Sequence, residues 1–218
     1  MSILADALEP LVNVWNAIAL DADAVFEMAS SWQLNSKVYY EVRAMRPPGE
    51  IERAAQFMYL NKGAFNGLWR VNSSGGFNVP WGRPKSQFMG DVENIRRVSE
   101  LTRASAGVVR HADFAQIIRL AKSGDLLFLD PPYVTTKSAG SFIHYNDRVF
   151  AWDDQVRLAE SAKLAVARGV KVLATNAFHP AIRDLWGGFA HFELTRQSTM
   201  AAGSAKRGRV SESLFVSR

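Results

Sequence analysis

The chain has 218 residues, of which 48% are hydrophobic and 22% charged. These proportions are those of an ordinary soluble protein, and the length suits one α/β domain with an insertion. No apolar run approaches membrane-spanning length, and the N-terminus lacks the basic-then-apolar order of a signal peptide, so we expect a cytoplasmic protein without a membrane partner. The absence of cysteine excludes disulfides, thiolate metal sites and a cysteine nucleophile, and four scattered histidines do not suggest a metal site.

The formal charge is distributed unevenly along the chain. Residues 1–30 contain five acidic residues and no Lys or Arg, which leaves +10 on the remainder of a chain whose total is +5. A basic body suits a phosphate-binding surface, because cations that neutralise phosphates release counterions. A generally basic soluble protein has the same charge, so charge alone does not decide between the two.

The first expected elements are the end of a strand at residues 3–6 and a helix over residues 8–20, with apolar residues at helical spacing. Asp6 ends the strand. A carboxylate there either caps the following helix or accepts hydrogen bonds from ribose hydroxyls at the end of a nucleotide-binding strand.

Residues 22–62 predict three helices, the last over residues 50–61. The stretch 59–83 then contains five glycines and four asparagines, which forbid a long helix and require turns. Basic and aromatic residues alternate along it, a mixture that suits DNA, with cations for phosphate and guanine and rings or amides for the space left by a flipped base. The alternative is a structural loop that packs on the core. The interleaved residues are Lys62, Phe65, Trp69, Arg70, Phe77, Trp81, Arg83 and Lys85.

A helix over residues 88–105 and a strand over residues 107–110 precede Asp113 and Phe114. By itself Asp113 is a candidate helix N-cap. The next strand, residues 126–129, consists of four apolar residues, which predicts burial on both faces as in a parallel sheet.

The sequence Asp130-Pro131-Pro132-Tyr133 follows this strand directly. Neither proline can donate to a ladder, so the strand ends with a carboxylate, a proline carbonyl and an aromatic ring at its carboxyl end, where open α/β sheets bind ligands. The simpler interpretation is a Pro-rich turn with Asp130 as a solvated cap.

The last third of the chain predicts a loop over residues 134–147, which has the length of a functional lid. A helix is expected over residues 152–167, with Val156, Ala159 and Leu164 facing inward and Gly169 beyond its end. Strands at 170–174, 189–195 and 210–216, a short helix at 182–186 and a basic turn at 201–208 complete the pattern.

The Asp-Pro-Pro-Tyr sequence resembles the signature of the amino-group DNA methyltransferases. Together with Phe65-Asn66-Gly67-Leu68 and Phe77-Asn78-Val79-Pro80, it resembles the Dam-type N6-adenine methyltransferases. The resemblance implies a class I methyltransferase-like (Rossmann-like) α/β sheet with a helical target-recognition insertion. The catalytic core is then residues 1–28 and 105–218, and the insertion is residues 29–104.

By resemblance, the reaction is methyl transfer from S-adenosylmethionine to adenine N6 in duplex DNA after base flipping. The Asp130 side chain and the Pro131 carbonyl accept the two hydrogens of the exocyclic amine, Pro132 completes the turn, and Tyr133 stacks on the base. Asp6 contacts the cofactor ribose, and Asp113 and Phe114 contact its adenine. Aspartate rather than serine before the prolines favours adenine over cytosine N4.

The DNA-binding residues are also given by resemblance. Phe65 and Asn66 enter the duplex beside the flipped adenine, Arg70 reaches a guanine edge, and Leu68 and Pro80 make apolar base contacts. Asn72 and Arg83 complete the expected interface, and the matches suggest a GATC-like target. Pro84 departs from the tyrosine that the family often has after Gly-Arg. Regulation, repair and restriction-modification are all compatible roles.

The sequence lacks the Gly-Gly-Lys segment and the FxGxG loop with which Dam-type enzymes begin. By resemblance the family strand order is 3-2-1-4-5-7-6, and strand 1, the central one, is absent, so both neighbouring edges are expected to be unpaired and apolar. The chain by itself is therefore expected to bind S-adenosylmethionine very weakly and to methylate DNA little or not at all. Two alternatives follow: a DNA-binding pseudoenzyme without cofactor binding, or one half of a split enzyme whose second polypeptide supplies the glycine loop.

Overall fold

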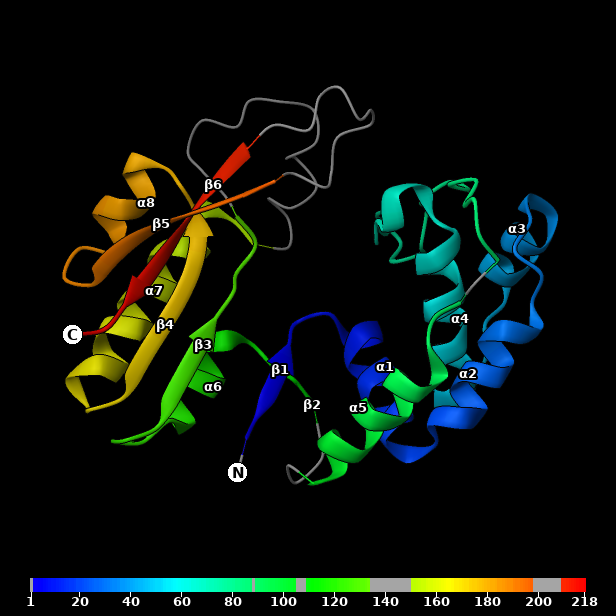
Figure 1. Ribbon diagram of the computed structural model, residues 1–218, viewed down its shortest axis with the longest axis horizontal. Helices are drawn as coiled ribbons and strands as arrows, with labels where there is room; N and C mark the ends of the chain where they lie inside the picture. Colours follow the sequence, from blue (N-terminus) through cyan, green and yellow to red (C-terminus); the bar gives the residue numbers. More distant parts are fainter. Residues whose placement is uncertain (1, 88, 105–108, 134–149, 198–208) are drawn as a thin grey trace. The chain divides into compact units, whose positions relative to one another are not determined.

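The computed structural model describes residues 2–87, 89–104, 109–133, 150–197 and 209–218. Within it the chain forms two compact units, Met1–Asp113 and Phe114–Arg218 (Figure 1). The first is mainly helical and the second is a sheet with helices against it. The division into a core of residues 1–28 and 105–218 and an insertion of residues 29–104 stays a prediction.

The helices of the first unit follow the apolar periodicity of the sequence. They are α1 (Glu9–Leu20), α2 (Ala22–Ser31), α3 (Ser36–Ala44), α4 (Glu50–Gly63) and α5 (Val92–Ala104), with a 3-10 turn η1 (Phe65–Gly67). The predicted positions are confirmed except that α5 begins later than residue 88. Gly90 has φ 138° and the Asp91 side chain accepts from the Glu93 amide at 3.0 Å, so the helix is capped at this point.

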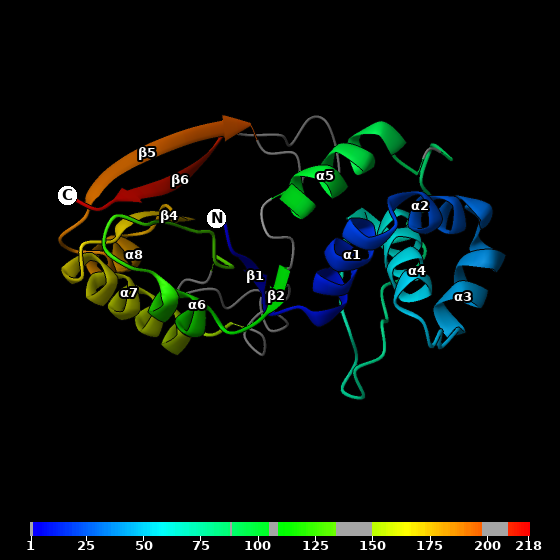
Figure 2. The same cartoon turned by 90° about the horizontal axis from the view of Figure 1, so that it is seen from below.

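Small buried residues bring the helices of this unit together. Ala17, Val25 and Ala54 are at most 1% exposed and form a core between α1, α2 and α4, which lie side by side in Figures 1 and 2. A second core, centred on Tyr39 and Tyr59, lies between α3 and α4.

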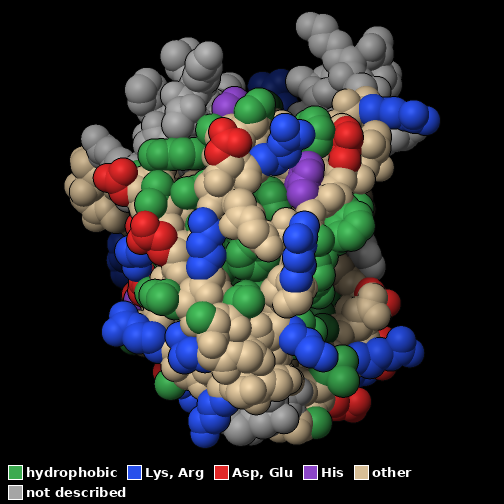
Figure 3. Space-filling model, turned by 90° about the vertical axis from the view of Figure 1, so that its left-hand side faces the viewer, with side chains coloured by type: hydrophobic (Ala, Val, Ile, Leu, Met, Phe, Trp, Pro, Cys, Tyr) green, Lys and Arg blue, Asp and Glu red, His purple; other side chains and the backbone are tan. Residues whose placement is uncertain are grey.

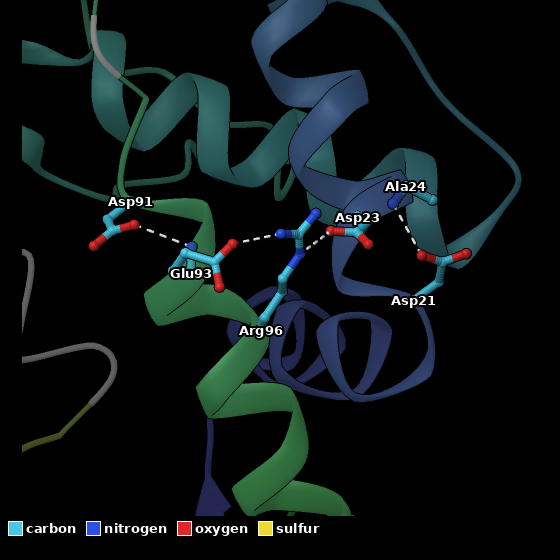
Figure 4. Close-up of polar contacts among 6 residues, drawn as sticks. All are labelled: Asp21, Asp23, Ala24, Asp91, Glu93 and Arg96. Atoms are coloured by element: carbon cyan, nitrogen blue, oxygen red, sulfur yellow. Dashed lines mark hydrogen bonds and ion pairs between the residues drawn. The ribbon is translucent and has the colours of Figure 1, made fainter.

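Charged residues join α5 to α2 at the surface of the same unit. Arg96 pairs with Asp23 at 2.7 Å and with Glu93 at 2.5 Å, while Asp21 caps α2 by accepting from the Ala24 amide at 2.9 Å (Figure 4). The three ion-paired side chains are 46–61% exposed, so water screens the pairs and they contribute little to stability.

The first unit also contains a two-stranded parallel sheet of β1 (Leu4–Asp6) and β2 (Val109–His111). Asn16 of α1 binds the β2 backbone in both directions: its Nδ2 donates to the Val109 carbonyl at 3.0 Å and its Oδ1 accepts from the Val109 amide at 2.9 Å. A single side chain therefore satisfies both backbone groups of a residue that is 4% exposed.

The second unit is a four-stranded sheet in the order β3-β4-β6-β5. Its strands are β3 (Leu126–Leu129), β4 (Lys171–Ala177), β5 (Ala190–Gln197) and β6 (Arg209–Val216), with β3 and β4 parallel and β6 antiparallel to both β4 and β5. The two observed sheets have the partial orders expected from the family, 3-2 and 4-5-7-6.

Helices cover one face of this sheet. The core joins α6 (Phe114–Leu120), α7 (Trp152–Ala167) and α8 (Pro180–Leu185) to the buried side chains of Val172, Ala174 and Phe215, and Figure 2 shows α6 and α7 on one side of β4.

Two predictions about burial are wrong. Leu126 and Phe128 are 61% and 64% exposed, whereas Leu127 and Leu129 pack against the core that the described helices of the second unit form, so β3 is buried on one face only. Leu164 is 64% exposed because the buried stripe of α7 runs through Gln155, Leu158 and Ala162, and Leu164 lies on the opposite side of the helix.

The Asn16 contact gives the first prediction. Asn16→Ala leaves the buried Val109 amide and carbonyl without partners, and should lower the free energy of unfolding by about 2 kcal/mol. Asn13→Ala is the matched control on the same helix, because Asn13 makes one exposed hydrogen bond, to the Glu50 carbonyl at 3.0 Å. It should cost less than about 1 kcal/mol. Urea unfolding measures the free energy of unfolding of both variants. Equal decreases would show that the two hydrogen bonds of Asn16 to Val109 stabilise the protein no more than the single bond of Asn13.

Candidate active site and nucleic-acid interface

The strand β3 ends at Leu129 and places Asp130 beside Thr175 of β4. The register pairs Leu129 with Ala174, so the next residues of the two parallel strands are neighbours. The Thr175 hydroxyl donates to Asp130 Oδ1 at 2.5 Å. Asp130 is otherwise exposed, and its second carboxylate oxygen accepts no hydrogen bond from the described residues. It is therefore an oriented acceptor rather than only a solvated cap.

A buried amide pair holds the turn that follows. Gln155 of α7 donates from Nε2 to the Pro132 carbonyl at 2.8 Å and accepts at Oε1 from Asn176 Nδ2 at 2.9 Å. Both amides are 0% exposed. Asn176 Oδ1 in turn accepts from the Ala177 amide at 2.9 Å. Since buried polar groups are costly when unpaired, this chain of contacts favours one geometry of the turn.

Tyr133 presents a half-buried ring at the same edge, with 38% of its surface exposed. Burial raises the pKa of its phenol above the ordinary value, and the Asp130 charge adds to that rise.

Asp6 is the last residue of β1, and Asp113 comes two residues after the adjacent parallel strand β2. Asp6 pairs in register with His111, and the Ala112 amide donates to the Asp6 carbonyl at 3.2 Å. Asp6 Oδ1 accepts from the Leu8 amide at 2.7 Å, which satisfies the turn before α1. The structure thus brings these two carboxyl-bearing residues to one sheet edge, and the capping interpretation of Asp6 is compatible with a second role.

Phe114 belongs to the second unit and begins α6. The Arg157 guanidinium lies 4.1 Å from its ring centroid, and the Phe150 ring lies 5.9 Å away. Its ring is therefore already packed on one side by the chain itself. Of the residues expected to bind the cofactor, Asp6 and Asp113 belong to the first unit and Phe114 to the second. The expected catalytic residues Asp130 and Tyr133 also belong to the second unit.

All seven residues expected to contact DNA are exposed, although they are interspersed with buried ones. They lie in residues 64–83, which we call the recognition segment, where backbone bridges join Ala64 to Trp81 and Val71 to Phe77. The Phe65 amide donates to the Pro80 carbonyl at 3.0 Å, so two of the seven are neighbours. The exposed set is Phe65, Asn66, Leu68, Arg70, Asn72, Pro80 and Arg83.

The backbone of the recognition segment is unusual where Phe65 and Asn66 protrude. Asn66 and Gly67 have φ of 53° and 62°, consecutive left-handed residues that asparagine and glycine tolerate best. Asn61 Nδ2 donates to the Gly67 carbonyl at 2.7 Å and fixes the turn. Arg83 also has a positive φ, of 54°, and a strained conformation of this kind is commoner at functional positions.

Arg70 is held by a neighbour across the hairpin. Its Nε donates to Asn78 Oδ1 at 2.8 Å, and the Asn78 amide donates to the Arg70 carbonyl at 3.0 Å. Asn72 organises the turn between them, since its Oδ1 accepts from the Ser74 and Gly76 amides at 3.0 and 2.8 Å. Arg70 Nη2 also lies 3.5 Å from the Asn78 carbonyl, to which it donates. The alternative of a structural loop therefore describes part of the segment, although the Arg70 side chain remains exposed.

The tryptophans of the recognition segment pack inward instead of facing DNA. Trp69 lies between Phe57, at 4.0 Å between ring centroids, and Phe77, at 4.5 Å, and Trp81 lies 5.3 Å from Tyr39. The Tyr39 hydroxyl donates to the Val79 carbonyl at 3.0 Å. Of the segment's aromatic residues, Phe65 alone is exposed, at 44%.

Sequence reasoning missed Gln155, Thr175 and Asn176. The available signals were an amide on the apolar stripe of a helix and two polar residues at the end of the strand next to Asp130. The predicted lid over residues 134–147 and the basic turn over residues 201–208 lie outside the described residues.

The described residues were also compared with the requirements of a metal site and of a membrane-spanning helix. They contain no group of three or more His, Asp or Glu placed to bind a metal ion, and none of their helices is long and apolar enough to cross a membrane. The face drawn in Figure 3 carries Lys and Arg side chains among hydrophobic ones.

Comparison with known proteins decides the family. A sequence model of the D12 class N6 adenine-specific DNA methyltransferases matches residues 2–200. The chain belongs to this family. Its members are enzymes that methylate adenine in DNA, and as methyltransferases they generally use S-adenosylmethionine.

Individual relatives agree over nearly the whole chain. A type II methyltransferase of Lactococcus lactis subsp. cremoris is 32% identical over 97% of this chain and 77% of its own length. A DNA adenine methylase of Vibrio cholerae is 29% identical over 98% of this chain and 79% of its own. The retron Ec67 DNA adenine methylase of Escherichia coli is 27% identical over 99% and 75%, respectively. None of these matches supports a second polypeptide.

The recognition segment of this D12 chain provides the second prediction. A Cβ at Gly82 would lie 2.4 Å from the Ala64 carbonyl oxygen, so Gly82→Ala must displace the backbone that carries Phe65. We expect DNA affinity to fall about tenfold, equivalent to about 1.4 kcal/mol. Gly76→Ala is the control in the same segment, because its Cβ meets side-chain atoms only at 3.4 Å. Binding to duplex DNA measures both, and equal affinities would contradict the packing argument.

Proposed function

We propose that this chain transfers the methyl group of S-adenosylmethionine to N6 of an adenine flipped out of duplex DNA. The observation that carries the proposal is the oriented acceptor set after β3. Asp130 has one oxygen fixed by Thr175, and within the described residues its other oxygen and the Pro131 carbonyl accept no hydrogen bond. Two acceptors of this kind match the two hydrogens of an exocyclic amine, and accepting both directs the nitrogen lone pair out of the base plane.

The residues of the first unit suit the nucleoside part of the cofactor. Asp6 uses Oδ1 for the Leu8 amide, which leaves Oδ2 for ribose hydroxyls, and Asp113 follows the neighbouring strand. The side of the Phe114 ring away from Arg157 is assigned to the cofactor adenine. When bound, the cofactor supplies an electrophilic methyl group. The protein's part is to hold the amine, exclude water and provide Tyr133 as a surface for the base.

The recognition segment is assigned to the duplex. Phe65 and Asn66 project from a left-handed turn and are suited to enter the stack beside the extruded base. Leu68 and Pro80 offer apolar contacts, Asn72 and Arg83 add polar ones, and Arg70 offers a planar guanidinium to a guanine edge. The resemblance of these residues to the Dam-type enzymes makes a GATC-like sequence the target that we propose.

The chemical role of Asp130 gives the third prediction. Asp130→Ala removes an acceptor that matters most while charge develops on the amine, so kcat should fall by at least about 100-fold with DNA affinity within about twofold. Radiolabelled methyl incorporation and DNA binding measure the two quantities. Asp153→Ala, at an exposed residue in the first turn of α7, is the control and should keep activity. A kcat of Asp130→Ala close to that of the starting protein would contradict the proposed role of Asp130.

The role of Arg70 gives the fourth prediction. A bidentate contact to guanine discriminates by roughly 1–3 kcal/mol, so Arg70→Ala should relax the preference at one base pair more than it weakens binding to unrelated DNA. Competition between duplexes that differ at single positions provides the test. Asn78→Ala, which frees Arg70 Nε without removing the guanidinium, should relax the same position less. A uniform loss over all duplexes would make Arg70 a phosphate contact.

A further inference from the structure

We propose that Thr175 is a positioning residue for methyl transfer, and that the buried pair Gln155–Asn176 assists it by selecting which proline carbonyl remains available to the substrate amine. The inference rests on the proposed function and assigns how its acceptor set is built. It concerns three residues from two elements, β4 and α7, that converge on the turn after β3.

Thr175 is fixed by the sheet itself. It lies in β4, which is hydrogen-bonded to β3 on one side and to β6 on the other, and its own register partner is Leu214. Ala174, just before the threonine, belongs to the ladders with both β3 and β6, and Asn176, just after it, belongs to the ladder with β6, so the backbone around Thr175 cannot shift without disturbing them. A β-branched side chain in a strand has a restricted χ1 angle, so the hydroxyl has a defined position.

A threonine hydroxyl has one proton, and here it donates to Asp130 Oδ1 at 2.5 Å. The contact fixes the rotation of the carboxylate and leaves Oδ2 as the acceptor for substrate. Without it, an exposed carboxylate at the end of a strand samples several rotamers. Only some of these would face the amine, so the fraction of productive complexes would fall.

The amide pair acts on the other acceptor. Gln155 Nε2 occupies the Pro132 carbonyl at 2.8 Å, whereas the Pro131 carbonyl accepts nothing from the described residues. Gln155 cannot rotate to release it, because its Oε1 accepts from Asn176 at 2.9 Å and both side chains are 0% exposed. The pair thus fixes the orientation of the turn and leaves one carbonyl, that of Pro131, beside Asp130.

The experiment compares Thr175→Val with Thr175→Ser in the full chain. Valine keeps the branched shape and removes the hydroxyl, and serine restores the hydroxyl. Under single turnover with saturating S-adenosylmethionine and duplex DNA, Thr175→Val should methylate about 10- to 100-fold more slowly, with both affinities within about twofold. Thr175→Ser should recover to within about threefold of the starting protein.

Thr102→Val is the matched control. Thr102 is 7% exposed and its hydroxyl donates to the Val98 carbonyl at 2.8 Å within α5, so the same substitution there removes a hydroxyl away from the turn. It should leave the methylation rate unchanged. The comparison separates a positioning role from the general cost of removing a hydroxyl.

The outcomes distinguish this inference from the proposed function. A normal rate for Thr175→Val in an active protein overturns the inference alone, and an equal loss for Thr175→Ser shows that shape rather than the hydroxyl matters. If the starting protein methylates no adenine, the proposed function fails. The positioning of Asp130 is then decided by crystal structures, in which Thr175→Val should release the carboxylate into other rotamers, and a single unchanged rotamer would overturn it.

Discussion

The turn after β3 depends on the hydrogen bond from the buried Gln155 amide to the Pro132 carbonyl. Two prolines in succession provide no amide hydrogen, so the backbone of this turn cannot anchor itself through its own donors. The anchor must come from side chains, and α7 and β4 supply it through Gln155, Asn176 and Thr175. The consequence is a carboxylate and a carbonyl that hold a defined direction at the exposed end of a strand, as electrostatic preorganisation requires.

The first unit shows a similar arrangement around the segment that we propose to contact DNA, with a buried interior that supports exposed polar residues. Tyr39 and Tyr59 are fully buried, and burial raises the pKa of each to about 12. Both hydroxyls remain donors at physiological pH, Tyr39 to the Val79 carbonyl and Tyr59 to the Gln33 carbonyl. The helical core thereby reaches into the recognition segment, and exposed groups on a supported backbone lose less entropy when they bind.

The sequence predicted most helices and strands because apolar periodicity and Gly or Pro boundaries are local signals. Residues 152–167 were predicted as a helix and form α7, and the Asp-Pro-Pro-Tyr sequence located the end of β3. Exposure of Phe128 was not predictable in the same way, because burial depends on which elements cover a face and not on the strand's composition.

The partners of the site residues were beyond local reasoning for a related reason. Thr175 is 45 residues from Asp130, and Gln155 is 23 residues from Pro132, so their contacts exist only in the folded sheet. The predicted roles of Asp6, Asp113 and Phe114 stay predictions, although the first two do share a sheet edge. The hydrogen bond between Arg70 and Asn78 could likewise not be predicted from the sequence, because it forms only in the folded hairpin.

The central claim is that this member of the D12 class methylates adenine at N6 in duplex DNA with S-adenosylmethionine as donor. The most direct measurement is to incubate the purified chain with isotopically labelled S-adenosylmethionine and duplex DNA, digest the DNA to nucleosides, and identify the labelled product by mass spectrometry. We expect the label in N6-methyldeoxyadenosine, and only with DNA that contains the preferred site. Label in N4-methyldeoxycytidine, or no labelled nucleoside at saturating cofactor and DNA, would contradict the account.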